Sequence, residues 1–304
     1  MQERRARWSW IIVGYLAAHA ALGSALAQDT SRKESPPTTA AESAAVRTQP
    51  PAPPGGTAET VAGRAAGAPE SAADYIAAAD RERAAMQPRG ALEDFEHAIA
   101  LDSNNYEALY KASREAVDLG EFEPNPAAKQ QDFDTGLRFA QRATVVNPTG
   151  PDGHFALARA LGRQALAVGG KKRIQFAKQV RAEALAALSY DPNHAGALHV
   201  MGVWNAEVMR LSGIERFIAR NLLGGGILGT ASWKEAVRYL QEAVAIEPKR
   251  IVHHLDLGKV YADIGEKSKA RQQFQVVLST PPAEYNDPHY KDDAQHQLAR
   301  LGTG

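Results

Sequence analysis

Residues 251–282 read IVHHLDLGKVYADIGEKSKARQQFQVVLSTPP, and this stretch has the periodicity of two helices joined by a turn. Its first half puts large and small side chains on one helical face, at spacings of three, one and three: His254, Leu257, Gly258 and Tyr261. Gly265 interrupts that helix, and Pro282 ends the next one. The inner face of the second helix carries Ala270, Phe274 and Val277. Because Gly258 and Ala270 are small, the two backbones can approach closely, so the stretch predicts a helical hairpin.

This arrangement of large and small residues is typical of a tetratricopeptide repeat, and its register recurs four more times toward the amino terminus. In these copies, small residues stand where the two helices of a pair face each other. The joints that follow the copies are polar and contain Ser103, Pro148, Pro192 and Pro248. Five copies in one register predict an all-α solenoid of about five helix pairs, which forms a folded domain over residues 71–304.

The joints are unevenly spaced. They fall at positions 103, 148, 192, 248 and 282, so the successive intervals are 45, 44, 56 and 34 residues. Only the last interval matches the usual tetratricopeptide length of ~34 residues. We therefore expect the other copies to hold extra residues between the two helices of a pair. Residues 287–301 predict a capping helix for the last repeat, with one apolar side formed by Ala294, Leu298 and Leu301.

The composition of the 304 residues excludes several classes of site. The chain contains no cysteine, which rules out disulfides, zinc–thiolate sites, thiol nucleophiles and lipid attachment to an amino-terminal cysteine. The 35 basic and 35 acidic side chains give a formal net charge of zero, so there is no reason to expect a nucleic-acid partner.

The amino-terminal segment has the features of an export signal. A largely apolar run covers residues 8–27 and ends in Ala25-Leu26-Ala27, which fits a signal-peptidase site. The run follows a basic start made of Arg4, Arg5 and Arg7. We expect residues 1–27 to direct Sec-type export, which would make the protein periplasmic or secreted; the alternative is an uncleaved inner-membrane anchor formed by residues 8–27. Residues 28–70 are rich in Pro and Ala and predict a disordered linker.

Several segments resemble one family of tetratricopeptide proteins. They are residues 171–175 (KKRIQ), 191–194 (DPNH), 199–204 (HVMGVW), 211–216 (LSGIER), 236–248 and 265–271 (GEKSKAR). Over about residues 73–302 the chain resembles the regulator of microtubule dynamics family, and the long insertion after Trp204 is its most family-like feature. The resemblance implies a helical-repeat fold. In parts of the family it also implies an amino-terminal membrane anchor, association with microtubules, or organelle tethering and phospholipid transfer.

The first helix of each pair lines the concave side of such a stack, which defines candidate partner-binding residues. Directly after the leading large position, the inward residues are mostly apolar or aromatic: Ile76, Tyr110, Phe155, His199 and Leu255. Four positions further along, the row is partly basic: Asp80, Arg114, Arg159, Val203 and Lys259. Together the two rows suit an extended acidic peptide or a lipid headgroup. The alternative is that they are ordinary core edges and solvated charges.

Two features around the insertion are also candidates. Residues 217–228 predict either a lid over a lipid or peptide, or a segment that packs back on the repeats. Because exposed apolar patches are rare, we favour the packed segment. The lid would be formed by Phe217, Ile218, Leu222 and Leu223. Lys171, Lys172 and Arg173 have the charge to contact phosphate or an anionic membrane, although a solvated helix start explains them more simply.

Other motifs give no indication of chemistry. Gly169-Gly170-Lys171 lacks the preceding strand and the following Ser or Thr of a phosphate-binding loop. The paired histidines His253 and His254 lack carboxylates at ligand spacing, as do His289 and His296, so we interpret His254 as a structural core histidine. We expect neither a metal nor a cofactor, and no catalytic motif is present to indicate an enzyme.

Two functions remain open from the sequence. The first is a non-enzymatic scaffold in the cell envelope that binds a protein or peptide partner through its concave groove. The second is a lipid- or amphiphile-binding or transfer module, with residues 217–228 as its lid. An apolar cavity large enough for acyl chains would favour the second function, and a continuous open groove without a cavity would favour the first.

Overall fold

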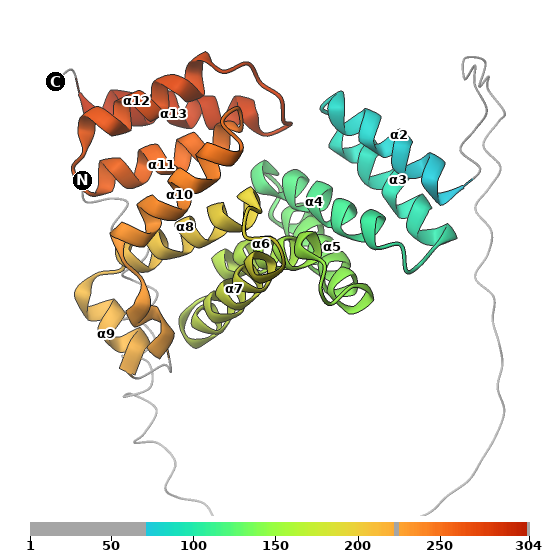
Figure 1. Ribbon diagram of the computed structural model, residues 1–304, viewed down its shortest axis with the longest axis horizontal. Coiled ribbons are helices and arrows are strands. Elements are labelled where there is room, and N and C mark those ends of the chain that lie inside the picture. Colours follow the sequence, from blue (N-terminus) through green and yellow to red (C-terminus); the bar gives the residue numbers. More distant parts are fainter. Residues whose placement is uncertain (1–70, 222–224, 303–304) are drawn as a thin grey trace, which may run out of the picture. The chain divides into compact units, whose positions relative to one another are not determined.

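The part of the chain that the structure describes is a series of helices (Figure 1). The computed structural model describes residues 71–221 and 225–302, and within these ranges it contains helices and no strand. The first helices are α2 (Ala72–Ala84), α3 (Pro88–Leu101), α4 (Tyr106–Phe122), α5 (Pro126–Val146), α6 (Pro151–Ala167) and α7 (Gly170–Tyr190). They are followed by α8 (Ala195–Arg210), α9 (Gly213–Asn221), the 3-10 helix η1 (Gly226–Thr230), α10 (Trp233–Ile246), α11 (Ile251–Asp263), α12 (Lys267–Ser279) and α13 (Asp287–Leu301).

The helices pack in pairs, α2 with α3, α4 with α5, α6 with α7, α8 with α10, and α11 with α12. Small residues allow this packing: a Cβ atom on Gly258 of α11 would lie 2.5 Å from Cε1 of Phe274 in α12. Across the contact between α8 and α10, a Cβ atom on Gly202 would lie 2.5 Å from Cγ of Leu240. Within the described residues, these pairs confirm the predicted all-α tetratricopeptide-type solenoid.

Side chains at the polar joints determine where helices begin. Asn105 Oδ1 accepts a hydrogen bond from the Ala108 amide at 3.0 Å at the start of α4. His194 Nδ1 accepts one from the Ala197 amide at 3.1 Å at the start of α8. These caps satisfy amide groups that have no partner inside the helix, so the joints predicted from the sequence are helix starts as well as turns.

The prediction that extra residues lie between the two helices of a pair is wrong for two of the long repeats. α4 and α6 have 17 residues and α5 and α7 have 21, whereas α11 and α12 have 13. The turns inside the two long pairs span only residues 123–125 and 168–169. The added residues therefore lengthen the helices and extend the contact within the pair. Among the described pairs, only α8 and α10 are separated by an insertion, which contains α9 and η1.

α13 covers the last pair, as predicted. Ala294 is fully buried, and Leu298 and Leu301 pack against the hydrophobic cluster formed by α10, α11 and α12. Because this cluster would otherwise face water on one side, α13 completes the core of the last repeat.

Some predictions concern residues outside the described ranges. The export signal or anchor (residues 1–27) and the linker (residues 28–70) are among them, and so are Leu222 and Leu223 of the predicted lid. Within the described ranges, no helix is both long enough and apolar enough to cross a bilayer.

Candidate functional site

A cavity of about 430 Å³ lies among α6, α7, α8 and α11, and residues of α4, of the insertion and of the start of α13 complete its wall. Most of its wall is apolar: Phe155, Ile174, Val200, Trp204, Val208 and Leu228. Trp204 is held in place because its indole nitrogen donates a hydrogen bond to the Ala177 carbonyl oxygen at 2.8 Å. The volume and the apolar lining are those of a small-ligand site.

Eight of the ten predicted groove residues line this cavity or a smaller pocket beside it, whereas Ile76 and Asp80 of α2 line neither. Those in the cavity wall are Phe155, Arg159, His199, Val203, Leu255 and Lys259. Tyr110 and Arg114 line the smaller pocket of about 50 Å³, to which Phe155 and Arg159 also contribute. The spacing of four residues brings each predicted pair to one helical face, which explains why the rows meet in space. That a partner binds to them stays a prediction.

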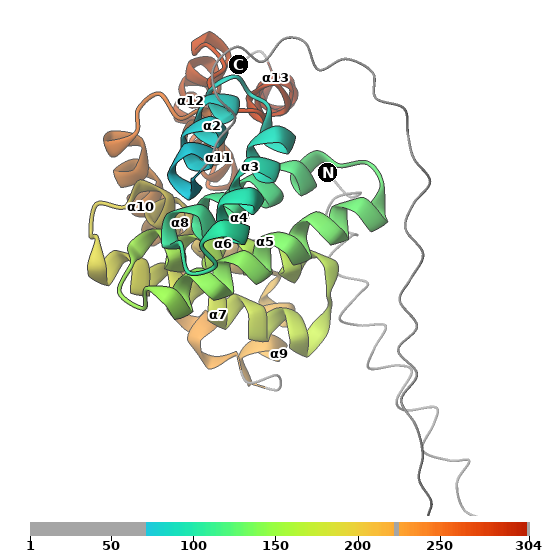
Figure 2. The ribbon, with the colours of Figure 1, turned by 90° about the vertical axis from the view of Figure 1, so that its right-hand side faces the viewer.

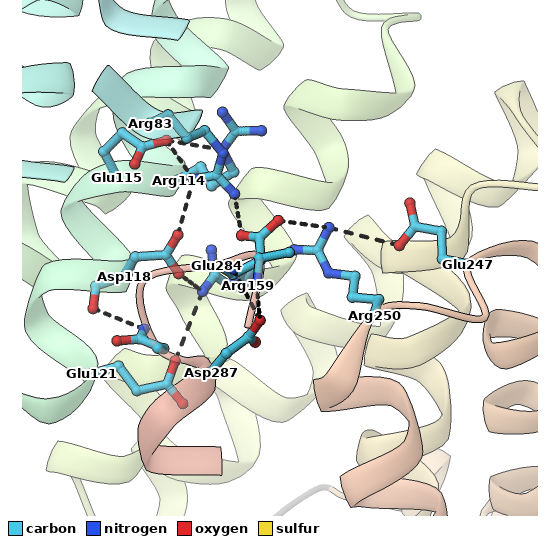
Figure 3. Close-up of polar contacts among 12 residues, drawn as sticks. Arg83, Arg114, Glu115, Asp118, Glu121, Arg159, Glu247, Arg250, Glu284 and Asp287 are labelled. Carbon is cyan, nitrogen blue, oxygen red and sulfur yellow. Dashed lines mark hydrogen bonds and ion pairs between the residues drawn. The ribbon is translucent and has the colours of Figure 1, made fainter. Parts of the chain in front are cut away.

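The arginines of the predicted groove are paired with carboxylates of α4 (Figure 3). Arg159 forms an ion pair with Asp118, and Arg114 Nε donates a hydrogen bond to Glu115 Oε1 at 3.0 Å. Arg83 of α2 adds a further guanidinium, whose Nη1 lies 2.7 Å from Glu115 Oε1 and 3.3 Å from Asp118 Oδ2. Asp118 was not predicted from the sequence, because it stands one helical turn beyond Arg114 and outside both predicted rows.

Burial and pairing act against each other on these groups. Burial acts to raise the pKa of Asp118, but the guanidinium groups of Arg159 and Arg83 outweigh it and lower that pKa. Burial acts to lower the pKa of Arg159, and the carboxylates of Asp118 and Glu121 reverse this effect and raise it. For Glu115, burial prevails over the nearby arginines and raises the pKa. Asp118 and Arg159 therefore remain a charged pair at neutral pH.

Lys259, at the other end of the basic row, is paired as well. Its Nζ lies 3.2 Å from Asp256 Oδ1 and 2.8 Å from Asp293 Oδ2. Burial acts to lower the pKa of Lys259, but the two carboxylates outweigh it and raise the pKa. The basic side chains of this row are therefore paired with carboxylates of the chain itself, and an acidic peptide as the partner stays a prediction.

A segment from the end of the chain reaches the same part of α4. We name residues 284–290 the C-terminal bridge. Asn286 Nδ2 donates a hydrogen bond to the Asp118 carbonyl oxygen at 3.0 Å, and the Tyr290 hydroxyl donates one to Glu121 Oε2 at 3.0 Å. The bridge thus connects the second helix pair to the start of the capping helix α13.

Further contacts strengthen the C-terminal bridge. Glu284 forms an ion pair with Arg83 of α2, and the rings of Phe122 and His289 stack with their centroids 4.2 Å apart. Several residues of the bridge also line the cavity: Glu284, Asn286, Asp287 and Tyr290. The sequence predicted a cap here, but gave no signal that the cap closes one side of the site, because the contacts join residues far apart in the chain.

Two histidines form a hydrogen-bonded pair in the cavity wall. Nδ1 of His199 in α8 lies 3.0 Å from Nδ1 of His253 in α11. His253 Nε2 lies 3.0 Å from Glu247 Oε2, and His199 Nε2 lies 3.2 Å from Asp256 Oδ2. Burial lowers the pKa of His253 to about 4, so its ring is neutral at pH 7. A neutral His253 that donates from Nε2 to Glu247 accepts a hydrogen bond at Nδ1 from His199.

His254 lies in the core beside this pair. Its Nδ1 is 2.7 Å from Gln273 Oε1 and its Nε2 is 2.9 Å from the Pro248 carbonyl oxygen, so both ring nitrogens have partners. In the part of the chain that the structure describes, no group of three or more His, Asp or Glu side chains is arranged to hold a metal ion.

The insertion after Trp204 packs on the repeats through one face. Ala219 of α9 and Leu228 of η1 are buried in the cluster that contains Ile174. Phe217, predicted for the lid, is 62% exposed, and Ile218 is partly buried; neither lines the cavity. The described part of the insertion therefore supplies a wall of the cavity, while Phe217 faces solvent.

The fold and the cavity together define a tetratricopeptide-type helical-repeat protein with a ligand-sized cavity. The family model described as Regulator of microtubule dynamics protein 1-3 matches residues 73–302. The chain therefore belongs to the regulator of microtubule dynamics family, which confirms the resemblance carried by residues 171–271.

The chain is similar to known members of this family. It is 25% identical to regulator of microtubule dynamics protein 1 of Mus musculus over 207 residues, and this match covers 67% of this chain and 65% of the mouse protein. Against the Bos taurus protein of the same name it is 25% identical over 200 residues, which is 65% of this chain and 62% of the bovine one. The chain thus spans less than two thirds of the length of these relatives.

A solved structure supports the fold. The chain aligns with a thermophilic TPR protein of Thermus thermophilus with a TM-score of 0.52 and 17% identity, over 74% of this chain and 100% of that chain. At this level of identity the likeness concerns the fold alone.

Proposed function

We propose that the chain is a non-enzymatic amphiphile-binding module that holds an apolar tail in the cavity of its repeat stack. The observation that carries the proposal is the cavity of about 430 Å³ with its largely aliphatic and aromatic wall. An acyl chain that moves from water to such a wall gains about 0.8 kcal/mol for each buried CH₂ group. Polar residues of the wall, among them Arg159, His199 and Lys259, are placed to contact the headgroup.

The charges of the wall favour a headgroup of low net charge. Arg159 and Lys259 already have carboxylate partners, so a strongly anionic headgroup would compete with Asp118 or Asp256. Separating a buried ion pair leaves a charge without compensation and is costly. A neutral or zwitterionic headgroup can form hydrogen bonds with the wall and leave these pairs intact.

Gly162 of α6 offers a direct test of this function. It lines the cavity, and a Cβ atom placed on it would meet no atom within 4 Å. Gly162→Leu therefore puts its Cβ atom in open space and adds an apolar side chain to the cavity wall. We expect native mass spectrometry to show a bound amphiphile on the wild-type protein, and about a tenfold weaker affinity in Gly162→Leu, which corresponds to ~1.4 kcal/mol.

Ala100→Leu is the matched control, because Ala100 lies on the exposed side of α3 and is not part of the cavity wall. It adds a comparable apolar side chain and should leave the bound amphiphile unchanged. If the wild-type protein carries no amphiphile, or if both variants carry the same amount, the proposed function is wrong.

The smaller pocket supports a second candidate function, a scaffold that binds a protein or peptide. Its walls come from the first helices of two successive pairs, with Tyr110 on α4 and Phe155 on α6. Concave surfaces of this kind bind extended segments in many repeat proteins. Capture of a partner that is lost in Tyr110→Ser and kept in Gly162→Leu would favour the scaffold; the opposite pattern for an amphiphile would favour the first function.

We infer that the module acts in the cell envelope, although the relatives are named for microtubule regulation. The inference is supported by the basic start and the apolar run of residues 8–27, which lead into Ala25-Leu26-Ala27. Mass spectrometry of the protein from its native cells should find a mature chain that begins at Gln28. A chain that retains residues 8–27 in a membrane fraction would point to the anchor instead, and a full chain in the cytoplasm would contradict export.

A further inference from the structure

Helix α9 presents large apolar side chains to solvent while its other face is anchored. Ile214 is 73% exposed and Phe217 is 62% exposed, whereas Ala219 is buried. A reciprocal cap holds the start of the helix: the Ser212 amide donates to Glu215 Oε2 at 2.8 Å, and the Glu215 amide donates to Ser212 Oγ at 3.2 Å. The exposure of Ile214 and Phe217 is therefore a property of a fixed helix.

The start of α7, which is strongly basic, lies beside α9. Residues 170–182 contain five basic residues and no acidic one, in a chain whose formal net charge is zero. Lys171 and Lys172 are exposed. Ile174 is buried in the same cluster as Ala219, and α7 and α9 are neighbours in both views (Figures 1 and 2). Positive charge and exposed apolar groups thus occur together.

This region is continuous with the cavity. We name the α7–α9 surface after the exposed residues that form it: Leu166, Lys171, Lys172, Ile214 and Phe217. Leu166, which is 56% exposed, also lines the cavity, as do Leu211 and Ala219 on the insertion side. A ligand tail that enters from this end would pass from the surface directly to the apolar wall.

We propose that the α7–α9 surface docks on an anionic bilayer, with Ile214 and Phe217 inserted between headgroups and Lys171 and Lys172 against lipid phosphates. This proposal rests on the proposed amphiphile binding, because the bilayer is the source from which a tail enters the cavity. Amphipathic helices with basic flanks bind to membranes in this way, lying in the interface with the apolar face buried.

The charge on the surface selects the bilayer over a second copy of the chain. If two α7–α9 surfaces met, each would bring its own lysines to the contact, and the like charges would repel. An anionic bilayer offers apolar depth and negative charge together. Val145 on α5, which is 79% exposed, does not belong to this surface and serves as a control for an isolated apolar side chain.

Because the chain has no cysteine, a single introduced cysteine directs a fluorophore to one position of the full chain. A label on α9 reports on the surroundings of α9 even if the amino terminus also binds to the membrane. Asn221→Cys, on the exposed side of α9, carries an environment-sensitive fluorophore, and Val145→Cys on α5 carries the same label as a control. Each protein is titrated with phosphatidylcholine vesicles with and without phosphatidylglycerol. We expect a blue shift and stronger emission only for the label at position 221, and only with phosphatidylglycerol.

Variants in the Asn221→Cys background separate the two contributions. Ile214→Ser with Phe217→Ser removes the apolar groups, and Lys171→Glu with Lys172→Glu reverses the charge. Each double variant should raise the lipid concentration at half response about tenfold. Lys267→Glu with Lys269→Glu reverses two exposed charges at the start of α12 and should change it less than about twofold, as expected for a site far from the contact.

Several results would overturn the docking proposal. These are an equal response of the labels at 221 and 145, a response at 221 that either double variant leaves unchanged, and a shift that depends on protein concentration without vesicles, which would indicate self-association. Native mass spectrometry on the same preparations distinguishes the two proposals: an amphiphile bound by a chain that fails to dock would leave the proposed function intact and discard only the α7–α9 surface.

Discussion

Single residues carry the closest contacts of the fold, and Gly258 is the clearest case. A Cβ atom at this position would lie 2.5 Å from Cε1 of Phe274, whose ring is fully buried. We expect Gly258→Ala to destabilise the protein by about 1–3 kcal/mol, because the clash exceeds the gain in helix propensity. Gly162→Ala, with nothing within 4 Å of its Cβ, should instead stabilise α6 by about 0.5–1 kcal/mol. Urea denaturation measures the free energy of unfolding of both variants, and equal unfolding midpoints for Gly258→Ala and Gly162→Ala would contradict these expectations.

His253 makes stability depend on pH in a definite direction. Burial lowers its folded-state pKa from 6.5 to about 4, so the unfolded chain takes up the proton more readily. The contribution of the neutral ring is complete above pH 6.5 and is lost as the pH falls toward 4, by roughly 3 kcal/mol. His253→Gln keeps a donor for Glu247 and removes this titration. Its free energy of unfolding should fall less than that of the wild type between pH 7 and 4; identical slopes would exclude the effect.

The groove residues show how far sequence reasoning extends at this scale. Tyr110, Phe155 and Leu255 were found because a helical period of 3.6 residues determines which positions share a face. The ion-pair partner of Arg159 was not predicted, because Asp118 belongs to the preceding helix pair and the contact depends on how successive pairs stack. The sequence register predicts which face of a helix a side chain lies on. It does not predict which charges two helices bring together.

Among the elements, the C-terminal bridge has the least expected role. Asn286 is buried, and its amide satisfies the Asp118 carbonyl oxygen at 3.0 Å. Asn286→Ala should cost about 1–2 kcal/mol, because it leaves a buried acceptor without this donor. Hydrogen exchange should accelerate first in residues 284–290, before α11 and α12. Asn193→Ala, in an exposed joint, should have little effect, and uniform acceleration along the chain would show that the bridge is not a local unit.

Element boundaries were predictable where the sequence marks them and ambiguous where it gives only a distance. The joints at Pro148 and Pro192 mark the ends of pairs, and the capping helix was predicted over the residues that form α13. The long intervals between joints indicated that a repeat contains additional residues, but not whether these lengthen its helices or form a separate segment. A long interval is compatible with longer helices, as in α5 and α7, and equally with an additional helix such as α9. Ser212-Gly213, where α8 has ended and α9 begins, marks the additional helix, but this pair alone did not predict it.

On the scale of the whole molecule, the bridge changes how the repeats unfold together. In an open solenoid each repeat contacts its neighbours alone, so distant repeats can unfold separately. Here α4 is tied to the start of α13 through Asp118–Asn286 and Glu121–Tyr290, which couples early and late pairs. We expect hydrogen exchange to show α2–α5 and α10–α12 losing protection at the same urea concentration in the wild type.

A variant with Glu284→Ala, Asn286→Ala and Tyr290→Phe removes the polar contacts of the bridge and leaves the core of each pair intact. Without this coupling, α2–α5 should lose protection at a lower urea concentration than α10–α12, because only nearest-neighbour contacts then connect them. The open wall should also release a bound amphiphile faster, since the bridge lines the cavity. Coincident unfolding of both halves in this variant would mean that stacking alone makes the repeats cooperative.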